Sequence, residues 1–314
     1  MKTPLIDNLQ YANWSETIFR QMHAGGVDAV HITIAYHESF REMVLNLEAF
    51  NRWFERFPEL IFKGTCAADV RLAQSTGRTA IFFGFQNPSP IEDDIGLVEI
   101  CHQLGVRFMQ LTYNNQSLLA TGCYEDDDTG LTRMGKQVVQ EMNRVGMVVD
   151  MSHSADRSTL EAIEHSSRPI AITHANPHWW HPALRNKSDD VLKALTGRGG
   201  MLGFSVYPHH LKDGPACTLQ SFCEMVAEAA SRYGAEHLGI GTDLCDIRRI
   251  EQSLERFGDR FINRIYDEYE IKKAMRRPSP APSFAQSWAA KESCAKALGT
   301  AFRLGVFWRD MVVQ

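Results

Sequence analysis

The stretch AVHITIA, residues Ala29–Ala35, is short, apolar at most positions and rich in β-branched side chains. Such a run predicts a parallel strand that is buried on both faces. Thr79–Phe85, TAIFFGF, has the same character. Six further runs complete the set, at residues 4–7, 107–113, 147–151, 169–173, 201–206 and 237–241. The sequence therefore predicts eight strands.

Segments with a helical spacing of apolar residues lie between many of these runs. They cover residues 95–104, 135–145, 158–163, 189–195, 219–233 and 287–304. Eight strands with intervening helices predict an α/β fold, a (β/α)₈ TIM barrel. We expect one domain over residues 1–314, with a flexible proline-rich loop at 276–284. The alternative is an open doubly wound sheet, but no G-x-G-x-x-G follows the first strand.

The composition of the 314 residues is that of a globular protein, with 44% hydrophobic and 23% charged side chains. A net charge of −5 and scattered basic residues argue against nucleic-acid binding. The apolar runs are too short to span a bilayer, and the first residues lack the apolar core of a secretory signal. The seven cysteines show no C-x-x-C spacing, so we expect a cytoplasmic protein without a disulfide framework.

Chemically competent residues follow three of the predicted strands. In a TIM barrel the active site lies at the carboxyl ends of the strands. His153 and His174 follow the fifth and sixth runs, and Asp243 follows the eighth. Two imidazoles can bind a divalent metal, and a carboxylate can take a proton from water. Either histidine could simply hydrogen-bond to a loop, but the two histidines and Asp243 together favour an active site.

Four segments resemble the membrane (renal) dipeptidase family, peptidase family M19. They are VDMSH at 149–153, Thr173 with His174, RNKSD at 185–189 and GIGTD at 239–243. EMNRVG at 141–146 matches as well, and the order and spacing agree. The resemblance implies an amidohydrolase-type barrel that hydrolyses dipeptides with two zinc ions, and a homodimer.

The resemblance also implies roles for individual residues. His153 and His174 match two ligands of one zinc ion, and Asp243 matches the aspartate that shuttles the proton of the attacking water. Arg185 matches the arginine that holds the substrate carboxylate, a task suited to a guanidinium group. Tyr207 matches a second carboxylate contact.

The sequence departs from the family pattern at four positions. Leu9 and Tyr11 stand where the family has its H-x-D ligands, and Gln86 stands where a glutamate bridges both metals. Tyr113 replaces a histidine that polarises the scissile carbonyl. Because leucine, tyrosine and a neutral amide are poor zinc ligands, we expect at most one divalent ion, zinc or another metal, or none. Gln86 is a further candidate ligand for that ion.

Two functions remain open on these grounds. The first is a dipeptidase-like hydrolase acting on a small dipeptide or amino-acid amide, with Asp243 and Tyr113 as catalytic residues. The second is a non-catalytic protein that binds a small carboxylate through Arg185 and Tyr207. Nucleophilic catalysis by Ser152 or Cys123 is a weaker reading, because neither has nucleophile-elbow spacing. We expect a small-molecule substrate and a homodimer, with no nucleic-acid or membrane partner.

Overall fold

The computed structural model describes residues 3–12, 14–243, 266 and 268–276. The chain divides into two compact units, Met1–Leu244 and Cys245–Gln314. The first unit holds the barrel. The predicted helix at 287–304 and the predicted loop at 276–284, apart from Arg276, lie outside the described residues.

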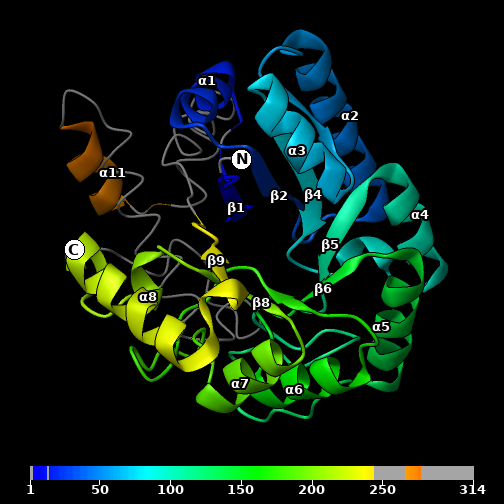
Figure 1. The fold of residues 1–314 in the computed structure, drawn as a ribbon, viewed down its shortest axis with the longest axis vertical. Helices are drawn as coiled ribbons and strands as arrows, with labels where there is room; N and C mark the ends of the chain where they lie inside the picture. The colour runs from blue at the N-terminus through cyan, green and yellow to red at the C-terminus, as the bar shows by residue number, and fades with distance from the viewer. Residues whose placement is uncertain (1–2, 13, 244–265, 267, 277–314) are drawn as a thin grey trace. The chain divides into compact units, whose positions relative to one another are not determined.

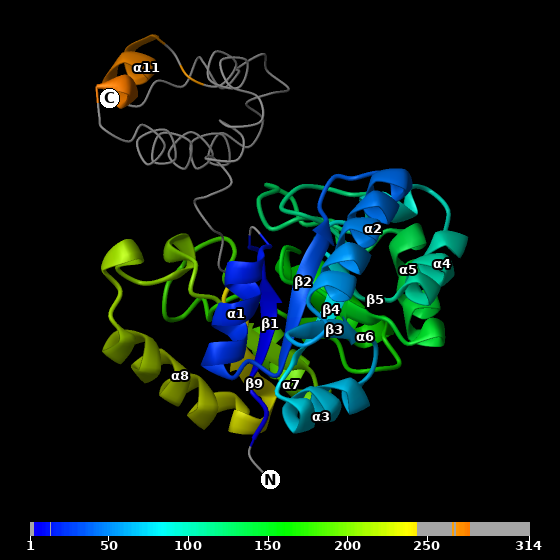
Figure 2. The same ribbon diagram turned by 90° about the horizontal axis from the view of Figure 1, so that it is seen from above.

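The strands of the first unit form one parallel sheet in the order β2-β1-β9-β8-β7-β6-β5-β4-β3. Their bounds are Ile6–Gln10 (β1), Ala29–Ala35 (β2), Ile61–Gly64 (β3), Thr79–Phe85 (β4), Val106–Gln110 (β5), Val148–Asp150 (β6), Ala171–Ile172 (β7), Met201–Phe204 (β8) and Leu238–Ile240 (β9). Figure 2 shows β1 and β2 side by side, as their pairing requires.

Pairing of β2 with β4 closes the sheet into a ring. The register runs from Ala29 opposite Ala80 to Ala35 opposite Phe85. Eight strands, β1, β2 and β4 to β9, therefore form the predicted (β/α)₈ barrel, and this fold prediction is confirmed. The sequence analysis did not predict β3, which pairs only with the first half of β4 and leaves the second half to β5.

Helices surround the strands and follow chain order around the ring in Figure 1. Their bounds are Glu16–Gly25 (α1), Phe40–Arg56 (α2), Ala67–Thr76 (α3), Gly96–Leu104 (α4), Arg133–Val145 (α5), Asp156–His165 (α6), Asp189–Gly197 (α7) and Leu219–Tyr233 (α8). The second unit contributes Glu268–Met275 (α11). No helix in the described part of the chain has the length and apolar character needed to cross a membrane.

The hydrophobic core lies between the strands and the inner faces of these helices. Ile32 in β2 and Phe83 in β4 are fully buried, as are Val138 and Met142 on one face of α5. The barrel also encloses polar groups. His31 in β2 is 3% exposed. Its imidazole lies so close to Gly84 in β4 that a Cβ at position 84 would collide with it. The packed core holds the strand ends in place, and the site lies at those ends.

Candidate active site

Two histidines meet at the carboxyl ends of β6 and β7. His153 and His174 are both buried, and their Nε2 atoms lie 3.0 Å apart. Each residue follows a strand directly or within three positions, so the parallel pairing of the strands brings the two rings together. The sequence placed both histidines at strand ends, and the structure brings them into contact.

Gln86 and Asn114 complete the surroundings of His153. Gln86 Oε1 lies 3.0 Å from His153 Nε2, and the Gln86 amide donates to Thr33 Oγ1 at 2.8 Å. Asn114 Oδ1 lies 2.6 Å from His153 Nδ1. Asn114 Oδ1 and Gln86 Oε1 can each only accept a hydrogen bond, so the shorter contact of 2.6 Å favours the tautomer with the proton on His153 Nδ1, in which Nε2 presents a lone pair. Asn114, directly after Tyr113, is a site residue that the sequence analysis missed.

The site keeps His174 neutral. Burial lowers the pKa of His174 well below its ordinary value, and the nearby cations, first Arg185, lower it further. Neutral imidazole is the form that binds metal ions. His174 therefore offers an uncharged nitrogen donor.

Arg185 and Lys187 bring buried positive charge to the same region. Arg185 is 2% exposed and donates to the carbonyl oxygens of Ser152 and His174, and its Nη2 lies 3.3 Å from His153 Nε2. Lys187 is 1% exposed and donates to the Ser154 carbonyl, and burial lowers its pKa to about 8. Neither cation is in an ion pair with another described residue, so the site is prepared for an anionic group.

Aromatic rings line the other side of the pair. The Tyr113 ring lies 4.3 Å from the His153 ring, centroid to centroid. Tyr36 packs edge-on against Tyr113, and Tyr11 packs edge-on against Tyr36. Leu9 is fully buried in β1. Tyr113, Tyr36 and Tyr11 thus form a series of ring contacts that begins at His153.

The donor atoms of the site lie close enough together to bind one metal ion. Zinc–nitrogen bonds are about 2.0–2.1 Å long, so nitrogens 3.0 Å apart can both reach one ion. Gln86 Oε1 is a third neutral donor beside them. No cluster of three His, Cys, Asp or Glu side chains suited to a metal occurs among the described residues.

Tyr207 and Asp243 are placed by contacts with residues other than His153 and His174. The Tyr207 ring lies against the rings of His209 and His210, at 5.4 and 5.1 Å. Asp243 follows β9, where its backbone N–H donates to the Leu9 carbonyl at 3.0 Å. Its φ of 54° lies in the left-handed region, which aspartate adopts more readily than most other residues with a side chain.

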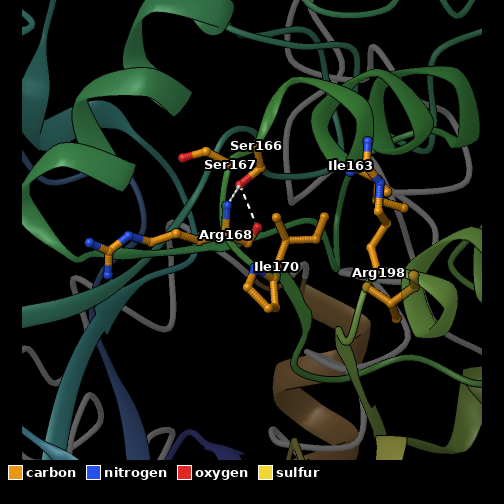
Figure 3. A pocket seen from close by; sticks show the side chains of 8 residues that line it. Ile163, Ser166, Ser167, Arg168, Ile170 and Arg198 are labelled. Atoms are coloured by element: carbon orange, nitrogen blue, oxygen red, sulfur yellow. Dashed lines mark hydrogen bonds between the residues drawn. The ribbon is translucent and has the colours of Figure 1, made fainter.

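A surface cavity of about 80 Å³ lies at the opposite end of the barrel (Figure 3). It is lined by Ser166, Ile170 and Arg198, among others, and so lies around the start of β7. The dashed lines in Figure 3 join Ser166 to the backbone of Arg168. Because active sites of this fold lie at the carboxyl ends of the strands, the cavity is not the catalytic site.

Fold and site together define an amidohydrolase-like barrel with a histidine pair at the carboxyl ends of its strands. The chain belongs to the membrane dipeptidase family, peptidase family M19, whose model matches residues 6–278. An amidohydrolase from Pseudomonas aeruginosa of known structure is 37% identical, with a TM-score of 0.75 over 77% of this chain and 74% of that one.

The curated relatives cover the chain in two different ways. Dipeptidase tcpJ of Claviceps purpurea is 28% identical over 231 residues, which are 73% of this chain and 53% of the relative. Holo-[acyl-carrier-protein] synthase of Methylorubrum extorquens is 66% identical over 76 residues, which are 24% of this chain and 56% of the synthase. The chain thus spans about half the length of the curated relatives it matches.

Proposed function

We propose that the protein is a dipeptidase-like hydrolase that acts on a small dipeptide or amino-acid amide and holds at most one divalent ion, with zinc as the first candidate. The convergence of His153 Nε2, His174 Nε2 and Gln86 Oε1 carries this proposal. Leu9, Tyr11 and Gln86 are the residues that argue against a second ion. When bound, a divalent ion would supply Lewis acidity, which makes water more acidic and polarises a carbonyl.

The chain's own residues supply binding and proton transfer in this proposal. Arg185 holds the substrate carboxylate, because its buried guanidinium lacks an anionic partner among the described residues. Asp243 accepts the proton of the attacking water, and Tyr113 donates a hydrogen bond to the developing oxyanion. A tyrosine carries no positive charge, so this stabilisation is weaker than that from a protonated histidine.

The test combines metal analysis with a panel of L,L and L,D dipeptides assayed with added Zn²⁺, Mn²⁺ or Co²⁺. We expect no more than one ion per chain and slow hydrolysis that falls further in Asp243→Asn. Two ions per chain, or turnover near the enzyme median of about 10 s⁻¹, would contradict the proposal. Binding of a dipeptide without turnover in every metal would favour a non-catalytic protein that binds small carboxylates through Arg185 and Tyr207.

We also propose that the protein is cytoplasmic and forms a homodimer. The described cysteines are all free, which supports a reducing cytoplasm. A homodimer is proposed from the family resemblance alone. Light scattering of the purified chain tests it, and a monomeric mass would contradict it.

A second candidate function concerns the synthase similarity. We infer that the synthase similarity lies mainly in the second unit, Cys245–Gln314. The matched lengths support this assignment, because the dipeptidase similarity covers 231 of the 314 residues and leaves room for a separate match of 76 residues. On this proposal the second unit binds an acyl carrier protein.

Hydrogen exchange of the full chain with and without an apo-acyl carrier protein tests the second candidate. We expect protection within residues 245–314 and none at His153 or His174. Absence of binding, or protection confined to the barrel, would contradict it. Asp243 belongs to the first unit, so we expect Asp243→Asn to lower hydrolysis and to leave carrier-protein binding unchanged. Loss of carrier-protein binding in this variant would contradict the separation of the two functions.

A further inference from the structure

Asp150, at the end of β6, is a fully buried carboxylate that the proposed mechanism does not use. It accepts four hydrogen bonds. Two come from the backbone N–H groups of Ser152 and Thr173, at 3.0 and 3.2 Å. Two come from the hydroxyls of the same residues, at 2.5 and 2.6 Å. This dense set of donors is what a buried negative charge requires.

Counting the hydroxyl protons fixes the state of His174. Thr173 has one hydroxyl proton, and it is donated to Asp150 Oδ2. Thr173 Oγ1 also lies 2.9 Å from His174 Nδ1, so in that contact the oxygen must accept. His174 therefore carries its proton on Nδ1, and its Nε2 lone pair faces His153. The neighbouring Ser152 hydroxyl offers no alternative, because its proton is also donated to Asp150.

The charges around the pair give Asp150 a second role. The three donor atoms of the site belong to two imidazoles and an amide, so no carboxylate is among them. Arg185 and Lys187 are buried cations nearby, and they would repel a metal ion. His153 Nδ1 is hydrogen-bonded to a neutral side chain, that of Asn114. His174 Nδ1 is hydrogen-bonded to the Thr173 hydroxyl, which in turn donates to the Asp150 carboxylate. A carboxylate behind a ligating histidine raises the basicity of that ligand.

We propose that Asp150 is a positioning residue that acts through the Thr173 hydroxyl. It holds His174 in the Nδ1–H form and supplies the counter-charge for a cation at the His153–His174 pair. The counter-charge role rests on the single-ion site of the proposed function. The role in holding the His174 tautomer does not, because it concerns the metal-free protein.

The test compares Thr173→Val, which removes the hydroxyl at nearly constant shape, with Thr173→Ser, which keeps it. One readout is the ¹⁵N NMR spectrum of the His174 ring in the metal-free full chain. The other is the Zn²⁺ dissociation constant, from competition with a chelator. We expect Thr173→Val to lose the pure Nδ1–H form and to bind Zn²⁺ about 10–100-fold more weakly, the range usual for such outer partners. Thr173→Ser should resemble the parent protein in both.

Asp150→Asn separates charge from hydrogen bonding, and near-UV circular dichroism shows whether each variant keeps its fold. We expect this variant also to lose at least about tenfold in Zn²⁺ affinity. An unchanged ring spectrum and an unchanged dissociation constant in Thr173→Val would overturn the proposal. If no protein binds Zn²⁺ but Thr173→Val alone changes the ring spectrum, the single-ion site is wrong and the positioning role stands.

Discussion

Gln86 is the residue at which the metal affinity of the site is easiest to change. Its amide donates to the hydroxyls of Thr33 and Tyr36, at 2.8 and 3.3 Å, and its oxygen faces His153. In Gln86→Glu both hydroxyls can turn to donate to the new carboxylate, so the side chain keeps its place and adds an anionic donor. We expect the Zn²⁺ dissociation constant to fall at least about tenfold, or ~1.4 kcal/mol.

The matched control is Gln140→Glu, which adds the same charge on the exposed face of α5. Isothermal titration of both variants with Zn²⁺ makes the comparison. Equal affinities of Gln86→Glu and the parent protein would show that Gln86 does not contribute to the ion site.

His31 links the buried polar interior of the barrel to pH. Its Nδ1 lies 2.7 Å from the Asn8 carbonyl oxygen, and its Nε2 has no hydrogen-bond partner. Burial lowers the pKa of His31 to about 4, although the nearby Asp150 charge opposes the shift. With an unfolded pKa of about 6.5, the unfolded chain binds the proton first as the pH falls. Stability is therefore full above pH 6.5 and falls between pH 6.5 and 4, by on the order of 3 kcal/mol.

Urea unfolding measured across this pH range checks the His31 prediction. We expect His31→Gln to flatten the dependence of the free energy of unfolding on pH. His178→Gln, at an exposed histidine, should leave the slope as it is. A slope that is the same in all three proteins would mean that other groups cause the acid sensitivity.

The sequence predicts the reactive atoms of the site better than their partners. His153 and His174 could be identified because each follows an apolar run, and the fold rule then places both at one end of the barrel. Asn114, Thr173 and Asp150 received no role, since their importance lies in hydrogen bonds formed only once separate strands pair. The asparagine at 114, with φ of 63°, carries no spacing signal of its own.

Among the elements, α2 has a capping box at its amino-terminal end. Ser39 Oγ accepts from the Glu42 N–H at 3.4 Å, and Glu42 accepts from the Ser39 N–H at 2.8 Å. Ser39→Ala removes one half of this capping box. We expect a loss of about 1 kcal/mol in the free energy of unfolding, measured by urea denaturation. Ser231→Ala, at an exposed position within α8, should change it by less than about 0.5 kcal/mol.

Strands were predictable where burial on both faces makes the whole run apolar. β2 and β4 were predicted at their observed bounds for that reason. β3 was missed because it is a four-residue strand, IFKG, that pairs along only half of its neighbour. The sequence analysis also did not predict α1, α2 and α3. Of these, α3 buries only Ala73, so its periodic signal is weak.

At the scale of the whole molecule, the chain carries two unequal similarities. The family match extends over residues 6–278, beyond the boundary at Leu244 between the two units. The barrel nevertheless closes before that boundary, because β9 pairs with both β8 and β1. The sequence analysis predicted one domain over residues 1–314, because eight strands with intervening helices fit a single barrel.

The number of bound ions can be measured from the stability of the whole chain. A ligand that binds only the folded state stabilises it by RT ln(1 + [L]/Kd), which is about 2.7 kcal/mol at 100 times Kd. Well above Kd, the free energy of unfolding rises with ln[Zn²⁺] with a slope of RT for one ion and twice RT for two. We expect a slope of RT, measured by urea unfolding in zinc-buffered solutions.

His153→Ala should abolish the dependence, because it removes one of the two imidazole donors, whereas the exposed-site variant His178→Ala should keep it. A slope of twice RT would restore the two-ion site that Leu9, Tyr11 and Gln86 argue against, and a slope of zero in the parent protein would leave the histidine pair without an ion.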